Sequence, residues 1–194
     1  MSTDLASFAF IITLAAVVNG LGIVRWVTGL AEYLRQRKKL SIEAYWIYIL
    51  FAGFQFLLHI LMWWSLWNVR GAGEINFLVY VYILTGPILL YLGTSVLAPD
   101  IVEGSVDMKA HYFAARTTYS TVLALLWLWA IFMSPLLRGI FAPMTPMYSL
   151  FLATAVGQRV TSNPQAQGAL AVANWLLLVL FITMYAMKLG GTAA

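Results

Sequence analysis

Residues 75–97 read INFLVYVYILTGPILLYLGTSVL, a run of 23 residues without a charged side chain. A helix rises about 1.5 Å per residue, so this run is long enough to cross the roughly 30 Å hydrocarbon core of a bilayer. Similar apolar runs occupy most of the chain on either side of it. The sequence therefore predicts a helical protein that crosses a membrane several times.

The composition supports the same conclusion. Of the 194 residues, 62% are hydrophobic and only 9% are charged, with eleven basic and seven acidic side chains and no cysteine. A soluble domain of this length would carry roughly 48 charged residues, because about a quarter of its residues are charged. The composition excludes a soluble globular domain, a disordered chain and a disulfide-stabilised scaffold.

We expect an all-α polytopic membrane bundle that forms a single transmembrane domain over residues 1–194. Its six predicted spans cover residues 5–27, 44–67, 75–97, 117–137, 139–156 and 169–187. The fifth span is the weakest, because it is short and carries Pro143 and Pro146 in its first part. The alternative is five spans with a re-entrant segment at 139–156.

The distribution of lysine and arginine predicts the orientation, because cytoplasmic loops carry an excess of these residues. Seven basic residues fall in loops on one side and three on the other: Arg35, Arg37, Lys38, Lys39, Lys109, Arg116 and Arg159 against Arg70, Arg138 and Lys188. Residues 35–43 are then a basic cytoplasmic loop, residues 98–116 a cytoplasmic interfacial segment, and both termini lie outside. Membrane orientation explains the net charge of +4, so no nucleic-acid partner is expected.

Polar side chains inside the spans are the first candidates for function, because they are costly in a bilayer. In the first span Asn19, Gly22, Arg25, Gly29 and Glu32 follow at steps of three and four and share one helical face. This face is either a packing surface whose Arg25 reaches the inner headgroups, or a site where Arg25, paired with Glu32, binds an anion or acts as a gating charge.

The second span carries Gln55, His59 and Trp63 on one face, at steps of four. Counting from the start of the span, His59 lies in the outer third of the membrane. One interpretation is a proton relay or a sensor of external pH. The other is a neutral histidine that hydrogen-bonds a neighbouring span.

Two further spans contain weaker candidates. Thr85, Gly86 and Pro87 interrupt the third span, where proline removes a backbone donor and either lines a polar site or only bends the helix. Asn174 in the sixth span is a further polar candidate, although packing explains it equally well.

The loop before the fourth span holds Glu103, Asp107 and His111. Ser105 or Asp107 is suited to cap a helix that leads into that span. A carboxylate and an imidazole four residues apart form a weak metal-binding pattern. A capping acid with a hydrogen-bonded histidine, in a segment that docks at the membrane surface, explains the same residues better, so we expect neither a metal nor another cofactor.

Three motifs in about the first two-thirds of the chain resemble an uncharacterised family of small bacterial multi-pass membrane proteins. They are a basic loop leading into Trp63-Trp64-x-x-Trp67, the run Gly86-Pro87-Ile88-Leu89-Leu90-Tyr91, and Asp107-x-x-x-His111-Tyr112-Phe113-x-x-Arg116. The family usually has a basic residue and a tryptophan after the arginine, where this chain has Thr117 and Thr118. The resemblance implies a bacterial inner membrane and this topology, and it implies no activity.

Three classes of function remain. Enzymes are disfavoured, because the chain has no cysteine, only two histidines, and no nucleophile-elbow or phosphate-loop motif, although a lipid-modifying enzyme stays possible. An oligomeric passive channel or small transporter is the second class. We favour the third, a non-enzymatic sensor or docking subunit that acts through its helix faces and residues 98–116. Its expected partners are the lipid bilayer and either copies of itself or a membrane complex.

Overall fold

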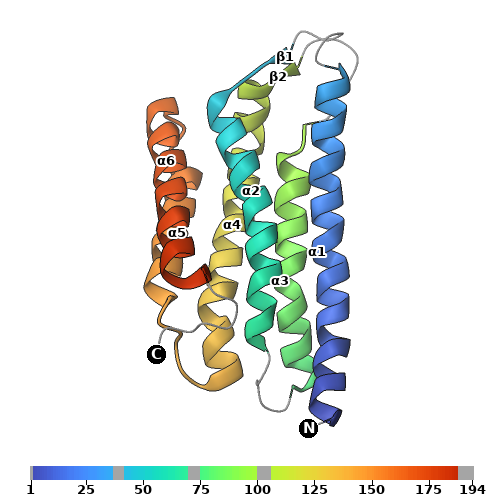
Figure 1. Cartoon of the computed structure of the whole chain (residues 1–194). Coiled ribbons are helices and arrows are strands. Elements are labelled where there is room, and N and C mark those ends of the chain that lie inside the picture. Colours follow the sequence, from blue (N-terminus) through green and yellow to red (C-terminus); the bar gives the residue numbers. More distant parts are fainter. Residues whose placement is uncertain (1, 37–41, 70–74, 100–105, 188–194) are drawn as a thin grey trace.

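The structure, a computed structural model, describes residues 2–36, 42–69, 75–99 and 106–187 (Figure 1). Over these ranges the chain forms six long helices, with a short 3₁₀ turn, η1 (Leu66–Val69), after the second and a π-helical turn, η2 (Ile182–Ala186), after the last. The helices are α1 (Ser2–Gln36), α2 (Trp46–Ser65), α3 (Phe77–Leu97), α4 (Met108–Arg138), α5 (Thr145–Val160) and α6 (Pro164–Phe181).

Five of these helices are long and apolar enough to cross a membrane. The qualifying segments are Ile12–Arg35, Trp46–Ser65, Phe77–Leu97, Met108–Arg138 and Pro164–Ala186. The predicted all-helical architecture is therefore confirmed, and the five apolar helices are consistent with a multi-pass membrane protein. The sixth helix, α5, has 16 residues and is not among the five.

Two helices have different bounds from those predicted. The fourth helix begins at Met108 and so extends beyond the predicted span 117–137. The expected cap is confirmed, because the carboxylate of Asp107 accepts hydrogen bonds from the backbone N–H groups of Lys109 and Ala110. Much of the segment expected to lie at the interface, residues 108–116, is thus the first part of α4.

The fifth helix is displaced toward the C-terminus. The preceding helix, α4, ends at Arg138 and is capped by Gly139, whose φ of 72° is a left-handed conformation that favours glycine. The helix α5 starts at Thr145, with Pro146 in its first turn, where a missing backbone N–H costs nothing. The prolines that weakened the prediction therefore mark the entry to a helix rather than an interruption inside one.

The helices run alternately up and down, and both described ends of the chain lie at the same end of the bundle (Figure 1). The helix α3 packs against α1 on one side and α4 on the other, and α5 packs between α4 and α6. At the opposite end β1 (Ile42–Glu43) and β2 (Val106–Asp107) form a two-residue parallel pair. The pair is parallel because the two strands lead into α2 and α4, which run in the same direction (Figure 1).

The outer surface of the bundle is apolar. Along α1 the exposed large side chains follow at helical spacing: Phe10, Leu14, Val17, Leu21 and Val24. A soluble protein rarely exposes such a continuous stripe, whereas lipid chains would cover it. The buried core is rich in aromatic rings, including the fully buried Phe51, Phe54 and Tyr119.

Close contact between α3 and α4 explains the glycine before the helix-interior proline. The Nε1–H group of Trp129 donates to the carbonyl of Tyr82 at 2.7 Å, and the Tyr82 hydroxyl donates to the carbonyl of Trp129 at 2.9 Å. A Cβ atom at Gly86 would lie 2.5 Å from the Trp129 ring. The small residue therefore lets the indole cross α3 beside Pro87.

This contact predicts that Gly86→Ala destabilises the bundle by about 1–3 kcal/mol, because the added methyl group displaces the indole and its hydrogen bond. Thermal unfolding of the purified protein in detergent measures the change. The matched control is Gly20→Ala, where an added Cβ meets no atom within 4 Å. Equal melting temperatures for the two variants would contradict the close α3–α4 contact.

Candidate functional site

His59 lies fully buried between two other helices. Its Nδ1 atom is 2.8 Å from Oδ1 of Asn19 on α1, and its Nε2 atom is 2.8 Å from the Thr94 hydroxyl on α3. The Asn19 amide nitrogen also donates to the backbone carbonyl of His59 at 3.0 Å. The imidazole of α2 therefore links α1 to α3 in the interior of the bundle.

Gln55, one turn away on α2, extends this network to a fourth helix. Its Nε2 atom donates to the Leu90 carbonyl at 2.9 Å and to the Thr94 hydroxyl at 3.3 Å. Its Oε1 atom accepts from the hydroxyl of Tyr119 on α4 at 3.2 Å. We call Asn19, Gln55, His59, Thr94 and Tyr119 the polar network.

The hydrogen bonds are compatible with an uncharged histidine. Because the Asn19 amide nitrogen donates to a carbonyl, Oδ1 of Asn19 is an acceptor, so Nδ1 of His59 carries a proton. The neutral imidazole then accepts from the Thr94 hydroxyl at Nε2. Each polar atom of the His59, Gln55 and Asn19 side chains thus has a partner with the histidine uncharged.

Two glycines make room for the polar side chains of α2. A Cβ atom at Gly22 would lie 2.1 Å from Cε1 of His59, and one at Gly93 would lie 3.0 Å from Nε2 of Gln55. The helical face predicted on the first span therefore contacts α2 at the depth of His59. Asn19 provides the hydrogen bonds and Gly22 provides the space.

The structure places the other predicted polar candidates outside this network. The hydroxyl of Thr85 donates to the carbonyl of Val81 on its own helix. Asn174 accepts from the Thr154 hydroxyl at 2.9 Å and so connects α6 to α5. Arg25 is half-buried and lines a cavity between α1 and α2, while Glu32 binds Arg35 one turn away instead of Arg25.

Two of the three residues considered as metal ligands, Asp107 and His111, make hydrogen bonds to the backbone instead. Asp107 caps α4, and Nε2 of His111 donates to the Leu97 carbonyl at 3.0 Å, at the end of α3. Glu103 lies outside the described residues, as do Arg37, Lys38 and Lys39 of the basic loop. Among the residues that the structure describes, no group of three or more histidine and acidic side chains could hold a metal ion.

A second polar cluster joins α4, α5 and α6 near the strand end of the bundle. The guanidinium of Arg116 donates to the carbonyls of Gln158, Arg159 and Thr161 at the end of α5. The side-chain amide of Gln167 also donates to the carbonyls of Gln158 and Thr161, and its oxygen accepts from the Tyr112 hydroxyl at 2.7 Å. These contacts satisfy carbonyls that a helix end leaves unpaired.

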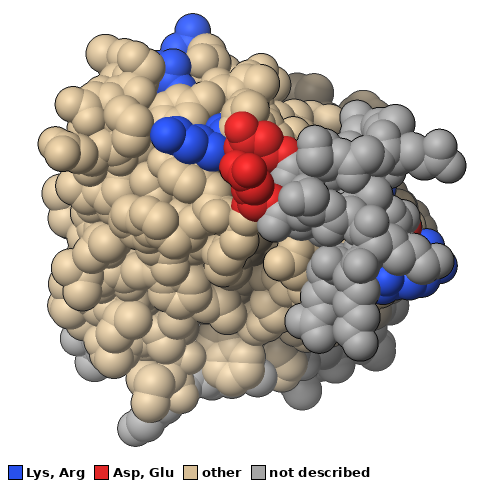
Figure 2. Space-filling view, turned by 90° about the horizontal axis from the view of Figure 1, so that it is seen from above, with Lys and Arg blue, Asp and Glu red and all other residues tan. Residues whose placement is uncertain are grey.

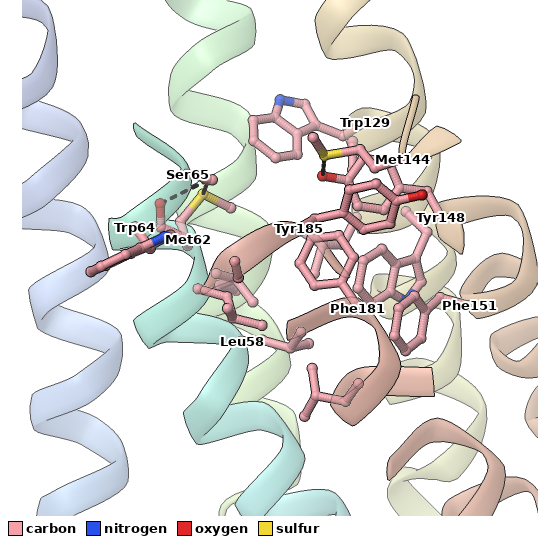
Figure 3. Close-up of a pocket in the computed structure, with 17 residues that line it drawn as sticks. Leu58, Met62, Trp64, Ser65, Trp129, Met144, Tyr148, Phe151, Phe181 and Tyr185 are labelled. Atoms are coloured by element: carbon pink, nitrogen blue, oxygen red, sulfur yellow. Dashed lines mark hydrogen bonds between the residues drawn. The ribbon is translucent and has the colours of Figure 1, made fainter. Parts of the chain in front are cut away.

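At the other end, a small cavity of about 90 Å³ lies between α2, α4, α5 and the turn η2. Figure 3 shows the aromatic rings of Tyr148, Phe151, Phe181 and Tyr185 on one side of it, and Leu58, Met62 and Ser65 of α2 on the other. The cavity is smaller than the roughly 300–1,000 Å³ of small-molecule sites. It is a gap in aromatic packing and does not form a ligand site of ordinary size.

Sequence reasoning found Asn19, Gln55 and His59 but missed Thr94 and Tyr119, and in the second cluster Gln158 and Gln167. A threonine or tyrosine is common in membrane helices, so its presence alone gives no signal. The spacing would have helped, because Gly93 and Thr94 form a small and polar pair on the third span, as Asn19 and Gly22 do on the first.

Comparison with known proteins found no matching family model, curated protein or solved structure. The five apolar helices are consistent with the multi-pass architecture that the resemblance implied, and none of these comparisons supports the family itself.

We predict that Asn19 and His59 are energetically coupled. In a double-mutant cycle, Asn19→Ala and His59→Ala will be less than additive by about 0.6–1.7 kcal/mol, the range found for hydrogen bonds between membrane helices. Reversible unfolding in mixed micelles measures each free energy. The control cycle pairs Asn19→Ala with Thr85→Ala, which lies outside the polar network; coupling as large there would contradict a specific contact.

Proposed function

We propose that the protein is a non-enzymatic module of a bacterial inner membrane that acts as a sensor or as a docking subunit of a larger assembly. The observation that carries this proposal is the polar network. Its intramembrane polar groups bind one another across four helices. Such an arrangement stabilises one packing of the bundle and leaves these groups no free atom for a passing ion.

A passive channel receives less support from the same contacts. A channel would be lined by the polar residues of the spans, which are Asn19, Arg25, Gln55, His59 and the Thr85-Gly86-Pro87 break. Of these, Asn19, Gln55 and His59 are each at most 1% exposed, whereas Arg25 is half-buried. A pathway between copies of the chain would need polar residues on the outer faces of the helices. The exposed large side chains described for α1 are apolar instead.

The strand end of the bundle offers a surface for docking. The β1–β2 register places the exposed Glu43 beside the exposed Asp107. Figure 2 shows acidic side chains near the middle of this face with basic side chains beside them. Because the strand pair and the Asp107 cap hold this region in place, a partner could bind it with little ordering cost.

We also propose that all six helices cross the membrane, with both termini outside. The short α5 supports this topology by lying antiparallel to both α4 and α6, with its polar carbonyl end satisfied by Arg116 and Gln167. Its 16 residues span about 24 Å, which a locally thinned bilayer accommodates.

The absence of cysteine makes the topology testable by labelling single-cysteine variants. In intact spheroplasts, a membrane-impermeant maleimide will label Ile140→Cys, whereas Glu43→Cys and Ser162→Cys will react only after permeabilisation. All three positions are exposed. Labelling of Ser162→Cys together with Ile140→Cys would show that α5 is re-entrant, and an inverted pattern would reverse the orientation.

The proposed function predicts that the purified protein in liposomes passes protons, potassium and small neutral solutes no faster than empty liposomes do. In native membranes the chain will migrate in a complex larger than its own oligomer. The double variant Glu43→Gln/Asp107→Asn will release it from that complex, since both charges are lost while asparagine still caps α4. Glu32→Gln, on α1, is the matched control.

Flux above the empty control that is lost in Gln55→Leu would replace this proposal with the channel. Migration of the chain only as a homo-oligomer, unaffected by the double variant, would remove the docking role.

A further inference from the structure

A cavity of about 420 Å³ lies between α1 and α2 and is lined also by the end of α3 and the start of α4. Its volume falls within the range of small-molecule sites. The wall is mainly apolar, with Trp26, Leu30, Ile49 and Leu97 among its residues. At its deep end the cavity reaches Gln55 and Thr94 of the polar network.

The cavity exists because α1 and α2 are tied together at only part of their length. Asn19 bonds to His59, and the Trp26 indole donates to the Ala52 carbonyl at 2.8 Å. Toward the strand end, small residues such as Gly29 face the space between the helices, and an added Cβ at Gly29 would meet nothing within 4 Å. The cavity therefore follows from how α1 and α2 are arranged.

The charged group in this wall is Arg25, for which the described residues provide no hydrogen bond or ion pair. The indole contact puts its neighbour Trp26 level with Ala52, six residues after the start of α2. Arg25 therefore lies about 9 Å inside the end of that span. Lipid chains cannot solvate a cation at this depth, so the guanidinium either reaches the headgroups or takes a counter-charge or water.

A second polar group in the wall is also unpaired. The Tyr45 hydroxyl is buried and has no hydrogen-bond partner. A tyrosine hydroxyl is neutral near pH 7, so this group is available as a hydrogen-bond donor. The cavity thus combines an apolar wall, an unpaired cation and the Tyr45 hydroxyl as a further donor.

We propose that this cavity binds a small organic anion with an apolar body, a single-chain carboxylate such as a medium-chain fatty acid. The carboxylate binds the Arg25 guanidinium, which matches it in charge and geometry. The chain lies against the apolar wall. A sugar or nucleotide would leave most of its polar groups unpaired there, and the volume suits one short chain rather than the two of a phospholipid.

This cavity gives the proposed sensor a ligand class, and its biological role therefore rests on the proposed function. The binding itself requires neither a partner nor transport, so it is measured separately from the docking and flux experiments. A failure of binding would leave the docking role standing, and a failure of docking would leave the site standing.

The test uses the full chain in phosphatidylcholine nanodiscs and a decanoic acid probe that carries a terminal diazirine. After illumination, mass spectrometry will locate the adducts on cavity residues of α1 and α2. Decanoate will compete with the probe, whereas decanol, with the same chain and no charge, will not. Arg25→Gln will weaken binding by about tenfold or more, as expected for a lost charge-assisted hydrogen bond, and Arg25→Lys will retain more of it.

A matched pair of variants keeps the test decisive if Arg25→Gln fails to fold. Gly29→Leu fills the cavity and will abolish labelling, whereas Gly20→Leu, on the same helix and also without a neighbour within 4 Å, will leave it unchanged. Equal competition by decanol and decanoate, or undiminished labelling in Gly29→Leu, would overturn the proposal.

Discussion

The bundle depends on one requirement, that a histidine inside a bilayer finds a partner for each ring nitrogen. His59 satisfies it with Asn19 on α1 and Thr94 on α3. Because both partners belong to other helices, the position of α2 along the membrane normal fixes those of its neighbours. Apolar packing alone provides little such register, since lipid chains are as apolar as leucine.

The same requirement explains where small residues occur. Gly22 and Gly93 lie where the polar side chains of α2 approach a neighbouring backbone, and Gly86 lies where the Trp129 indole crosses α3. Where no such contact exists, as at Gly29, the helices stand apart and a cavity remains. Close packing and the cavity therefore alternate along a single face of α1.

Most of the fold could be predicted from the sequence, because five long apolar runs leave little choice of structure. The helix α5 was harder to predict, since Pro146 in a first turn and proline in a loop look alike before the cap is known. The candidate site was predictable only in part. Helical spacing placed Asn19 on one face and Gln55 with His59 on another, but hydropathy does not reveal which helices are neighbours, so Thr94 and Tyr119 stayed unrecognised.

The way α5 is held has a consequence for biosynthesis. Its last carbonyls depend on Arg116, which is synthesised before it, and on Gln167, which is synthesised after it. A short helix with these dependencies gains little from entering the lipid alone. Under the proposed six-span topology, the three C-terminal helices are therefore suited to leave the translocon as one unit, once synthesis has passed the beginning of α6.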